Sequence, residues 1–286
     1  MLFLDAIELL IKNMETIGRS SATIKLYRRD LRRFAHHLAC KQNGPVYLED
    51  ITAADLEEFL HNLKELGIAP NSRSRYLYTF RAFYKFAYKK ELVDRDISQS
   101  IELIKIPAKE RQYLSQEEVE ELAKAIRQNI IRLVVLFLAN TGLRISECLS
   151  LTLDDVDLDK SMIRVIQGKG GKDRNVPINQ TLLPLLKDYR NNWRDAYGSD
   201  LFFATKKSGS LSNSYINTVI RNTVKKLGWK KQVSCHTLRH SFASSLVKKK
   251  VGLVEIQKLL GHSSLKVTSV YTHVDMDQLN EAVNAL

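Results

Sequence analysis

The sequence is poor in cysteine, has no long apolar run and shows no export signal. Cys40, Cys148 and Cys235 are odd in number and widely spaced, and no Cys/His cluster has zinc-binding spacing. We therefore expect free thiols in a reducing cytoplasm and no metal site. No apolar stretch approaches the roughly 18 residues that a membrane-spanning helix needs. The first residues contain an acid and no basic cluster, so neither a signal peptide nor a membrane partner is predicted.

Positive charge is what the sequence has in excess. It contains 44 Lys and Arg against 32 Asp and Glu, a formal net charge of +12 over 286 residues. Such a balance favours a polyanionic partner, and nucleic acid is a better candidate than a membrane surface. A general contribution of charge to solubility is the alternative explanation. The length allows one large domain or two ordinary ones, and 44% hydrophobic residues suffice for a proper core.

Four amphipathic helices are predicted in residues 1–103, over 4–15, after the break at Gly18–Ser21 where a serine is the cap, after Thr52 and over about 72–90. Two of them are strongly basic, and a single acid, Asp30, interrupts the basic face of the second. We favour phosphate contact over an ordinary solvated face for these positions. The aromatic residues of the fourth helix follow one face and are expected in the core. The predicted DNA contacts here are Lys25, Arg28, Arg29, Arg32, Arg73, Arg81 and Lys85.

A second domain is expected after a basic linker, residues 104–112, which contains a proline and has no periodicity. Ser115 and Glu118 have capping-box spacing, and the apolar run 130–139 predicts a buried helix. Short strands are expected over 156–158, 162–166 and 174–178, and helices over about 180–192, 213–227, 237–250, 252–260 and 264–272.

The glycine-rich segment 168–172, Gly-Lys-Gly-Gly-Lys, is a weak phosphate-loop signal. It lacks the spacing of a nucleotide-binding loop, and a strand rather than a helix is expected to follow it. A basic hairpin tip can instead reach into a DNA groove. Lys172 and Arg174 are therefore predicted as further DNA contacts.

The stretch from Cys235 to Thr272 gathers residues suited to a reaction at phosphorus. On a helix beginning near His236, Arg239 lies three positions on and shares its face. An arginine fork offers two parallel donors to two phosphate oxygens. The hydroxyl of Tyr271 has an ordinary pKa of about 10, so it attacks only where the developing charge is stabilised. Each residue alone is more often structural; the combination with His262 favours a catalytic site.

Arg144 is expected at the start of another helix, directly after a tight turn at Gly142. Glu147 lies three positions further on and could hold the arginine in place. An ordinary surface ion pair is the alternative explanation of this spacing.

Taken in order, these residues and motifs resemble the tyrosine recombinases of the lambda-integrase family, with a pattern closest to the Xer group. The motifs are TGLRISE, GKGGK followed by Arg174, HTLRH and LGH, and the residues are Arg144, Lys169, His236, Arg239, His262 and Tyr271. The resemblance covers nearly the whole chain. It implies a mainly α fold with a small β-sheet or hairpin, arranged as a two-domain DNA clamp. The implied parts are a helical, SAM-like core-binding domain over 1–103, a linker over 104–112, a catalytic domain over 113–273 and a tail helix over 274–286.

The resemblance also implies a mechanism. Tyr271 would attack the scissile phosphate, form a 3′-phosphotyrosyl link and release a 5′-hydroxyl. Arg144 and Arg239 would clamp the non-bridging oxygens. Lys169 would protonate the leaving oxygen, and no metal, ATP or other cofactor would be needed.

The remaining implied roles concern proton transfer and assembly. His236 and His262 would hydrogen-bond the phosphate, with His236 the expected acceptor of the tyrosine proton. Glu147 would orient the arginine and histidine side chains. The partner would be a double-stranded recombination site, bound by a homo-oligomer that is a tetramer in the synapse, each protomer contacting the next through its tail.

Two other classes of protein are also compatible with parts of the sequence. A DNA-binding protein without catalytic activity would explain the charge but not the joint presence of Tyr271, Arg144 and Lys169. A type IB topoisomerase shares the tyrosine chemistry, and the tail and N-terminal domain argue against it. A resolvase of chromosome dimers and an enzyme that integrates or excises DNA are not separated.

Overall fold

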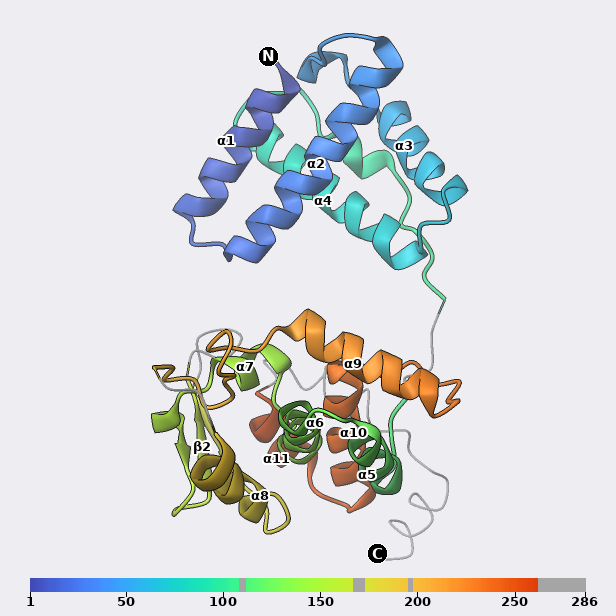
Figure 1. Ribbon diagram of the computed structural model, residues 1–286. Coiled ribbons are helices and arrows are strands. Elements are labelled where there is room, and N and C mark those ends of the chain that lie inside the picture. Colours follow the sequence, from blue (N-terminus) through green and yellow to red (C-terminus); the bar gives the residue numbers. More distant parts are fainter. Residues whose placement is uncertain (108–111, 167–172, 195–197, 262–286) are drawn as a thin grey trace, which may run out of the picture. The chain divides into compact units, whose positions relative to one another are not determined.

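The structure is a computed structural model that describes residues 1–107, 112–166, 173–194 and 198–261. The chain forms two compact units, Met1–Lys109 (unit 1) and Glu110–Leu286 (unit 2). Helices dominate both units, and one small sheet lies in unit 2 (Figure 1). The predicted fold class, mainly α with a small sheet, is confirmed. No helix among the described residues is both long and apolar enough to cross a bilayer.

Unit 1 is built on four α-helices whose ends the sequence specifies locally. The Ser20 hydroxyl accepts the Thr23 amide at the start of α2, and Thr52 and Asp55 form a capping box at the start of α3. Pro70 occupies the first position of α4, where its missing N–H costs nothing. The elements are α1 (Phe3–Thr16), α2 (Ser21–Gln42), η1 (Leu48–Asp50), α3 (Ala53–Glu65), α4 (Pro70–Lys89) and η2 (Ile97–Ser100).

Aromatic side chains form the centre of unit 1. Phe34 lies 4.8 Å from Phe80 and 5.2 Å from Phe59, ring centroid to centroid, and Phe3 lies 5.2 Å from Phe83. Such tilted and edge-to-face pairs add about 0.5–1.5 kcal/mol each beyond the burial of their area. The prediction that the aromatic face of the fourth helix is core is confirmed, because Tyr76, Phe80, Phe83 and Tyr84 are buried.

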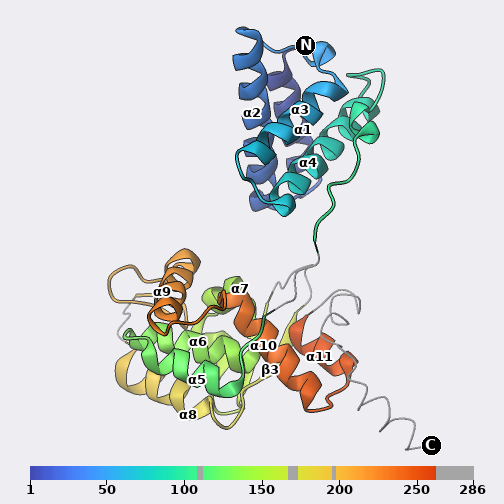
Figure 2. The same ribbon diagram turned by 90° about the vertical axis from the view of Figure 1, so that its right-hand side faces the viewer.

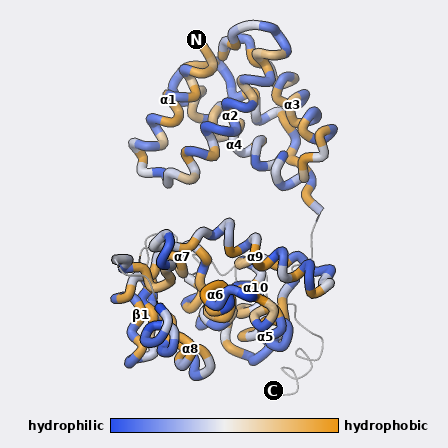
Figure 3. Tube along the Cα trace, in the orientation of Figure 1, coloured by the Kyte–Doolittle hydropathy of each residue, from blue (hydrophilic) through white to orange (hydrophobic). Residues whose placement is uncertain are grey.

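Unit 2 contains the remaining elements around one main core. Helix α6 lies near the middle of the unit and is mostly hydrophobic (Figure 3). Helices α10 and α11 pack against one another, as Figure 2 shows, and α10 also contacts α6. The helices are α5 (Gln116–Ala125), α6 (Asn129–Thr141), α7 (Ile145–Ser150), α8 (Leu183–Asp188), α9 (Asn213–Lys226), α10 (Cys235–Lys248) and α11 (Leu253–Leu260), with the short turns η3 (Leu153–Asp155) and η4 (Tyr189–Trp193).

The sheet has the order β1 (Val156–Asp157), β2 (Met162–Val165), β3 (Arg174–Pro177), with both pairs antiparallel. Side chains alternate along β2 and β3, so Ile163, Val165 and Val176 are buried and the residues between them are not. In this register Val165 pairs with Arg174. The three predicted strands are therefore present, each slightly shorter than expected.

One helix differs from the sequence expectation. The helix expected over about 180–192 is α-helical over α8 and then continues as a π-helical turn, η4. There the Tyr189 hydroxyl donates to the Phe202 carbonyl, and the Trp193 indole N–H donates to Asp188. These two bonds, one tertiary and one local, stabilise the wider π-helical turn. The spacing of apolar residues in the sequence does not reveal them.

Candidate active site

A tight turn at the end of α6 presents the first predicted catalytic arginine. Gly142 ends α6 with φ +64°, and a Cβ at this position would overlap the Phe242 ring. Glycine is therefore required by both backbone conformation and space. Two residues later, the backbone N–H of Arg144 donates to Glu147 Oε2 at 2.8 Å and begins α7.

Glu147 is the centre of the site. Its carboxylate accepts from Arg144 Nη1 at 2.7 Å, and from Arg174 Nη1 and Nη2 at 3.2 and 2.8 Å. Arg239 Nη1 lies 3.9 Å from Glu147 Oε2. The Glu147 side chain is 8% exposed, against 20%, 10% and 5% for Arg144, Arg174 and Arg239. Three guanidinium groups thus surround one buried carboxylate.

The protonation state of Glu147 follows from these contacts. Burial acts to raise its pKa, but the hydrogen bonds and charge of Arg174 and the hydrogen bonds from Arg144 outweigh it and lower the pKa to about 2. The carboxylate is therefore charged throughout the physiological range. Three arginines against one carboxylate leave a local net charge of +2, which suits a phosphate diester with its single negative charge.

The C-terminal end of α11 supplies a second set of acceptors for the same three arginines. Arg174 Nε donates to the Leu259 carbonyl at 3.0 Å, and Arg239 Nη2 donates to the Leu260 carbonyl at 2.6 Å. Arg144 Nη2 lies 3.5 Å from the Gly261 carbonyl. These carbonyls carry the negative end of the helix dipole. Three consecutive carbonyls therefore fix three guanidinium groups next to the position where His262 follows in the sequence.

Arg239 is held from both sides. Its Nη1 donates to the Gly142 carbonyl at 2.7 Å, so it joins the turn after α6 to the end of α11. Ser234 caps α10, accepting the Thr237 amide, and so sets where the first turn of α10 begins. Arg239 then lies one turn inside the helix, with its side chain pointing into unit 2.

His236 lies in the first turn of α10 and is exposed as a whole residue. Partial desolvation of its ring, followed by the positive charges of Arg239 and Arg144, lowers the pKa of His236 below its usual value. The imidazole is therefore neutral near pH 7 and able to accept a proton.

The structure brings together four of the residues predicted from the sequence, Arg144, Glu147, Arg174 and Arg239, with His236 near two of them. The predicted contact between Glu147 and Arg144 is present, and it is buried rather than a surface ion pair. Lys169, Lys172, His262, Tyr271 and the tail over 274–286 lie outside the described residues. Within the described ranges, no group of three His, Cys, Asp or Glu side chains is arranged to hold a metal ion.

Arg174 is where sequence reasoning and structure differ in emphasis. Its spacing after the GKGGK segment predicts a DNA contact, whereas the structure places it against Glu147 and Leu259. Nothing in the local pattern identifies these partners, since they lie 27 and 85 positions away. The DNA contact itself stays a prediction.

The four arginines of α2 divide between two neighbours. On one side Arg28 and Arg32 pair with Glu8 of α1, at 3.1 and 2.9 Å. On the other side Arg29 pairs with the fully buried Asp30 at 3.1 Å. Asp30 also contacts Arg75 of α4, whose Nε lies 2.9 Å from Oδ2.

Tyr76 completes the cluster on the second side of α2. The Arg75 guanidinium lies 4.9 Å from the Tyr76 ring centroid, and Arg33 donates to the Tyr76 hydroxyl at 3.2 Å. Arg29 and Arg75 remain 62% and 36% exposed, although the carboxylate they share is buried. Arginines held in place and still open to solvent are suited to phosphate contact.

Among the other basic residues predicted in unit 1, two arginines bond to backbone carbonyls and two lysines are exposed. Arg73 Nε donates to the Ile68 carbonyl at 3.1 Å, and Arg81 Nη2 donates to the Ile101 carbonyl at 2.9 Å. Lys25 and Lys85 are exposed. Each of these DNA contacts stays a prediction.

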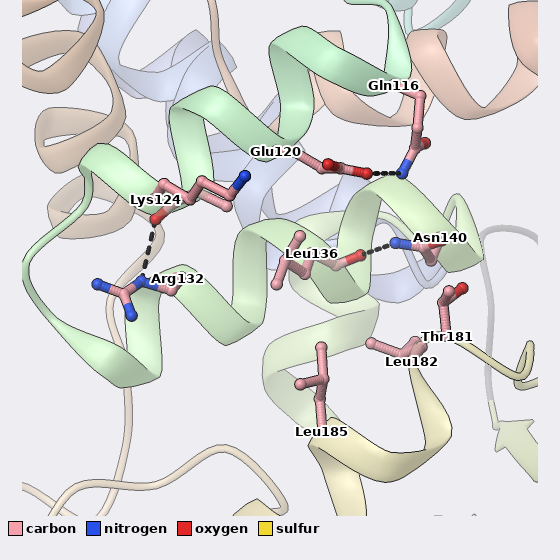
Figure 4. A pocket seen from close by; sticks show the side chains of 10 residues that line it. Gln116, Glu120, Lys124, Arg132, Leu136, Asn140, Thr181, Leu182 and Leu185 are labelled. Carbon is pink, nitrogen blue, oxygen red and sulfur yellow. Dashed lines mark hydrogen bonds between the residues drawn. The ribbon is translucent and has the colours of Figure 1, made fainter.

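A pocket of about 290 Å³ lies between α5, α6 and α8 (Figure 4). Its floor is apolar, with Leu136, Leu182 and Leu185, and charged side chains, among them Lys124 and Arg132, lie at its edge. Arg132 also donates to the Ala123 and Ile126 carbonyls and so closes the end of α5.

Two family models match the chain. Residues 112–278 match the phage integrase family, and residues 10–91 match the phage integrase N-terminal SAM-like domain.

Curated relatives match over nearly the whole length. The chain is 34% identical to tyrosine recombinase XerA of Pyrococcus furiosus, over 94% of this chain and 90% of that protein. It is 33% identical to tyrosine recombinase XerC of Oceanobacillus iheyensis, over 92% of this chain and 89% of that protein.

Solved structures agree in fold. The Tn1549 transposon integrase in complex with a circular intermediate DNA superposes with a TM-score of 0.80 over 100% of both chains, at 19% identity. XerH site-specific recombinase bound to difH superposes with a TM-score of 0.71 at 25% identity, over 97% of this chain and 83% of that one. With both units matched and relatives above 30% identity across nearly the whole sequence, the chain belongs to the phage integrase family of tyrosine recombinases.

Proposed function

We propose that this protein is a site-specific DNA recombinase that breaks and rejoins strands through a 3′-phosphotyrosyl intermediate at Tyr271. The observation that carries the proposal is the cluster of three arginines around Glu147, held by the carbonyls that directly precede His262. A fixed net positive charge of this kind stabilises the charge that develops on phosphate oxygens in the transition state. Tyr271 follows His262 by nine positions.

In this mechanism Arg144 and Arg239 bind the two non-bridging oxygens of the scissile phosphate. Neutral His236 accepts the proton of the Tyr271 hydroxyl as the oxygen attacks phosphorus, and His262 donates a hydrogen bond to the phosphate. The P–O5′ bond breaks and the leaving oxygen takes a proton from Lys169. Attack by another strand's 5′-hydroxyl on the phosphotyrosine reverses the step, so the link conserves bond energy and ATP is not required.

The DNA partner is a double-stranded recombination site contacted by both units. In unit 1 the arginines around Asp30, and likewise Arg28 and Arg32 beside Glu8, are proposed as phosphate contacts, since they are both positioned and open to solvent. In unit 2, Lys172 belongs to the segment between β2 and β3 and is proposed to reach the same DNA. The protein would act on chromosomal DNA in the cytoplasm, either resolving chromosome dimers or integrating and excising DNA. Selection of binding sites from genomic DNA separates these two roles.

The tail over 274–286 is proposed to dock in the pocket between α5, α6 and α8 of a neighbouring protomer. Leu279, Val283 and Leu286 recur at helical spacing, and the tail carries three acids and no Lys or Arg. The pocket offers an apolar floor, and its lining carries two basic residues, Lys124 and Arg132, against one acid, Glu120. A head-to-tail contact of this kind closes a ring, which is how a tetramer would assemble on DNA.

Deletion of 274–286 tests this docking. Single-site DNA binding should persist while formation of the synaptic complex, measured by native gel shift, is lost. Leu185→Glu, on a side chain that is 42% exposed, should reproduce the loss without unfolding the unit. Wild-type assembly by both variants would refute the docking.

The decisive test of the reaction is Tyr271→Phe on a nicked suicide substrate. Wild type should accumulate a protein–DNA band that survives a denaturing gel, whereas the Phe variant should bind DNA equally well and form none. Covalent adduct in the Phe variant would place the nucleophile elsewhere.

Cleavage should continue in excess chelator, because the neutralising charge comes from side chains. Supercoil relaxation without strand exchange between two sites would instead favour the topoisomerase alternative.

A further inference from the structure

The guanidinium group of Arg174 is enclosed by protein acceptors. Its Nε donates to the Leu259 carbonyl, and its Nη1 and Nη2 donate to the two oxygens of Glu147. Every nitrogen of the group therefore has a protein acceptor, and the side chain is 10% exposed. Arg144, by comparison, is 20% exposed, and its Nη2 makes a long 3.5 Å contact.

The same residue joins three elements of unit 2. It is the first residue of β3, it pairs both oxygens of the carboxylate on α7, and it reaches the last turn of α11. A Cβ at Gly261 would lie 3.0 Å from Arg174 Nη1, so the side chain is packed directly against the end of α11. Arg174 is thus positioned by tight contacts on three sides rather than directed toward solvent.

We propose that Arg174 is a positioning residue for strand cleavage: it shares both oxygens of Glu147 with Arg144 and so limits how strongly the carboxylate draws Arg144 and Arg239 away from the scissile phosphate. This inference rests on the proposed function of the site. It assigns Arg174 a role different from the direct DNA contact that its sequence position suggests.

The physical reason is competition for one buried carboxylate. With Arg174 present, the cluster holds three positive charges and one negative charge, a net +2. Without it, the net charge is +1, and Glu147 keeps only the hydrogen bonds from Arg144, with Arg239 Nη1 3.9 Å away as the nearest replacement donor. Both guanidinium groups would then shift toward the carboxylate and away from the substrate. Misplacement of a catalytic group by about 1 Å can cost about a hundredfold in rate.

The test compares Arg174→Met with wild type in two measurements. DNA affinity is measured as a function of salt concentration, and single-turnover cleavage is measured on the nicked suicide substrate at saturating protein. We expect affinity within about twofold of wild type, an unchanged salt slope, and cleavage slower by about a hundredfold. A salt slope reduced by about 0.9 with normal cleavage at saturation would identify a phosphate contact and overturn the proposal.

A matched double variant separates positioning from simple loss of structure. In Arg174→Met combined with Glu147→Gln, no charged carboxylate competes for Arg144 and Arg239, so cleavage should be at least tenfold faster than in Arg174→Met alone. A double variant as slow as the single one, or slower, would contradict the proposal. If Arg174→Met loses its cooperative melting transition, Arg174→Lys retains the charge and tests the same expectation, with cleavage between wild type and the Met variant.

Two further outcomes keep this inference distinct from the proposed function. If wild type forms no covalent adduct, the proposed function fails. If wild type cleaves and Arg174→Met cleaves at the same rate, this inference alone fails. A substrate with a 5′-bridging sulfur should not rescue Arg174→Met, because the expected defect lies at the non-bridging oxygens; rescue would assign the defect to protonation of the leaving group.

Discussion

Each unit of the protein contains a buried carboxylate with arginines around it, and the two clusters differ in how far those arginines are exposed. In unit 1 Asp30 is fully buried, but Arg29 and Arg75 are 62% and 36% exposed. In unit 2 the three arginines of Glu147 are between 5% and 20% exposed. The same pairing of charges therefore produces a solvated surface in one unit and a preorganised site in the other.

The difference matters because water screens charge. Around Asp30 the arginines remain partly hydrated, Arg29 more than Arg75, so their attraction to phosphate is weak per contact and depends on salt. Around Glu147 the groups are desolvated and held by backbone carbonyls, so their field on a bound phosphate is stronger and requires no reorganisation during the reaction. We infer that the first cluster serves binding and the second serves catalysis.

The largest effect that this comparison predicts is on cleavage by Arg144→Ala. Loss of one charged donor at the phosphate should slow single-turnover cleavage by about a thousandfold. DNA affinity should change little, because most of the exposed arginines proposed as phosphate contacts lie in unit 1. Arg29→Gln should show the reverse pattern, with weaker binding and normal cleavage at saturation. Equal effects of the two variants on both measurements would remove the distinction between the clusters.

Lys169→Ala should give the next largest effect, a loss of about a hundredfold or more in cleavage of ordinary DNA. A sulfur in the 5′-bridging position leaves without protonation, so the variant should recover on such a substrate while Arg144→Ala does not. This result would assign Lys169 to the leaving group and the arginine cluster to the non-bridging oxygens. Rescue of Lys172→Ala in place of Lys169→Ala would exchange the roles of the two lysines.

A smaller effect is expected from the double variant Arg29→Gln and Arg75→Gln in unit 1. Binding should weaken by about tenfold at moderate salt, and the slope of log affinity against log salt should fall by about 1.8 for two lost phosphate contacts. Arg28→Gln with Arg32→Gln removes the same charge from side chains of similar exposure that pair with Glu8, and so compares the two sides of α2. Equal loss of slope in both pairs would show that the whole basic face of α2 contacts DNA.

The smallest predicted effect is a shift in the pH dependence of cleavage. Because the pKa of His236 lies below its usual value, the neutral proton acceptor persists to lower pH, and the acid limb of the rate profile should lie below the ordinary value of about 6.5. Arg144→Lys retains the charge and should leave the limb in place. In Arg144→Ala the residual cleavage should show its acid limb at higher pH, because loss of a nearby positive charge raises the pKa of His236. An acid limb at or above 6.5 in wild type would contradict this assignment.

Much of the fold could be predicted because it is determined locally. The capping boxes at Thr52 and Ser115 mark helix starts in the sequence, and both are present. Apolar spacing placed α1, α6 and α9 to within one or two residues, since a helix repeats every 3.6 residues whatever it packs against. The contact between Arg144 and Glu147 is local as well, three positions apart on one short helix.

The sequence by itself determined the family, the order of the catalytic residues and the helical content of the chain. Only the tertiary structure decided which arginine meets which distant acceptor. Arg239 reaches the Gly142 carbonyl 97 positions away, and Arg174 reaches the Leu259 carbonyl 85 positions away. Backbone carbonyls are the same in every residue, so no residue type marks them in advance. Likewise, only the packing of α2 against α1 and α4 brings Arg28 to Glu8 and Arg75 to Asp30, pairs that lie 20 and 45 positions apart.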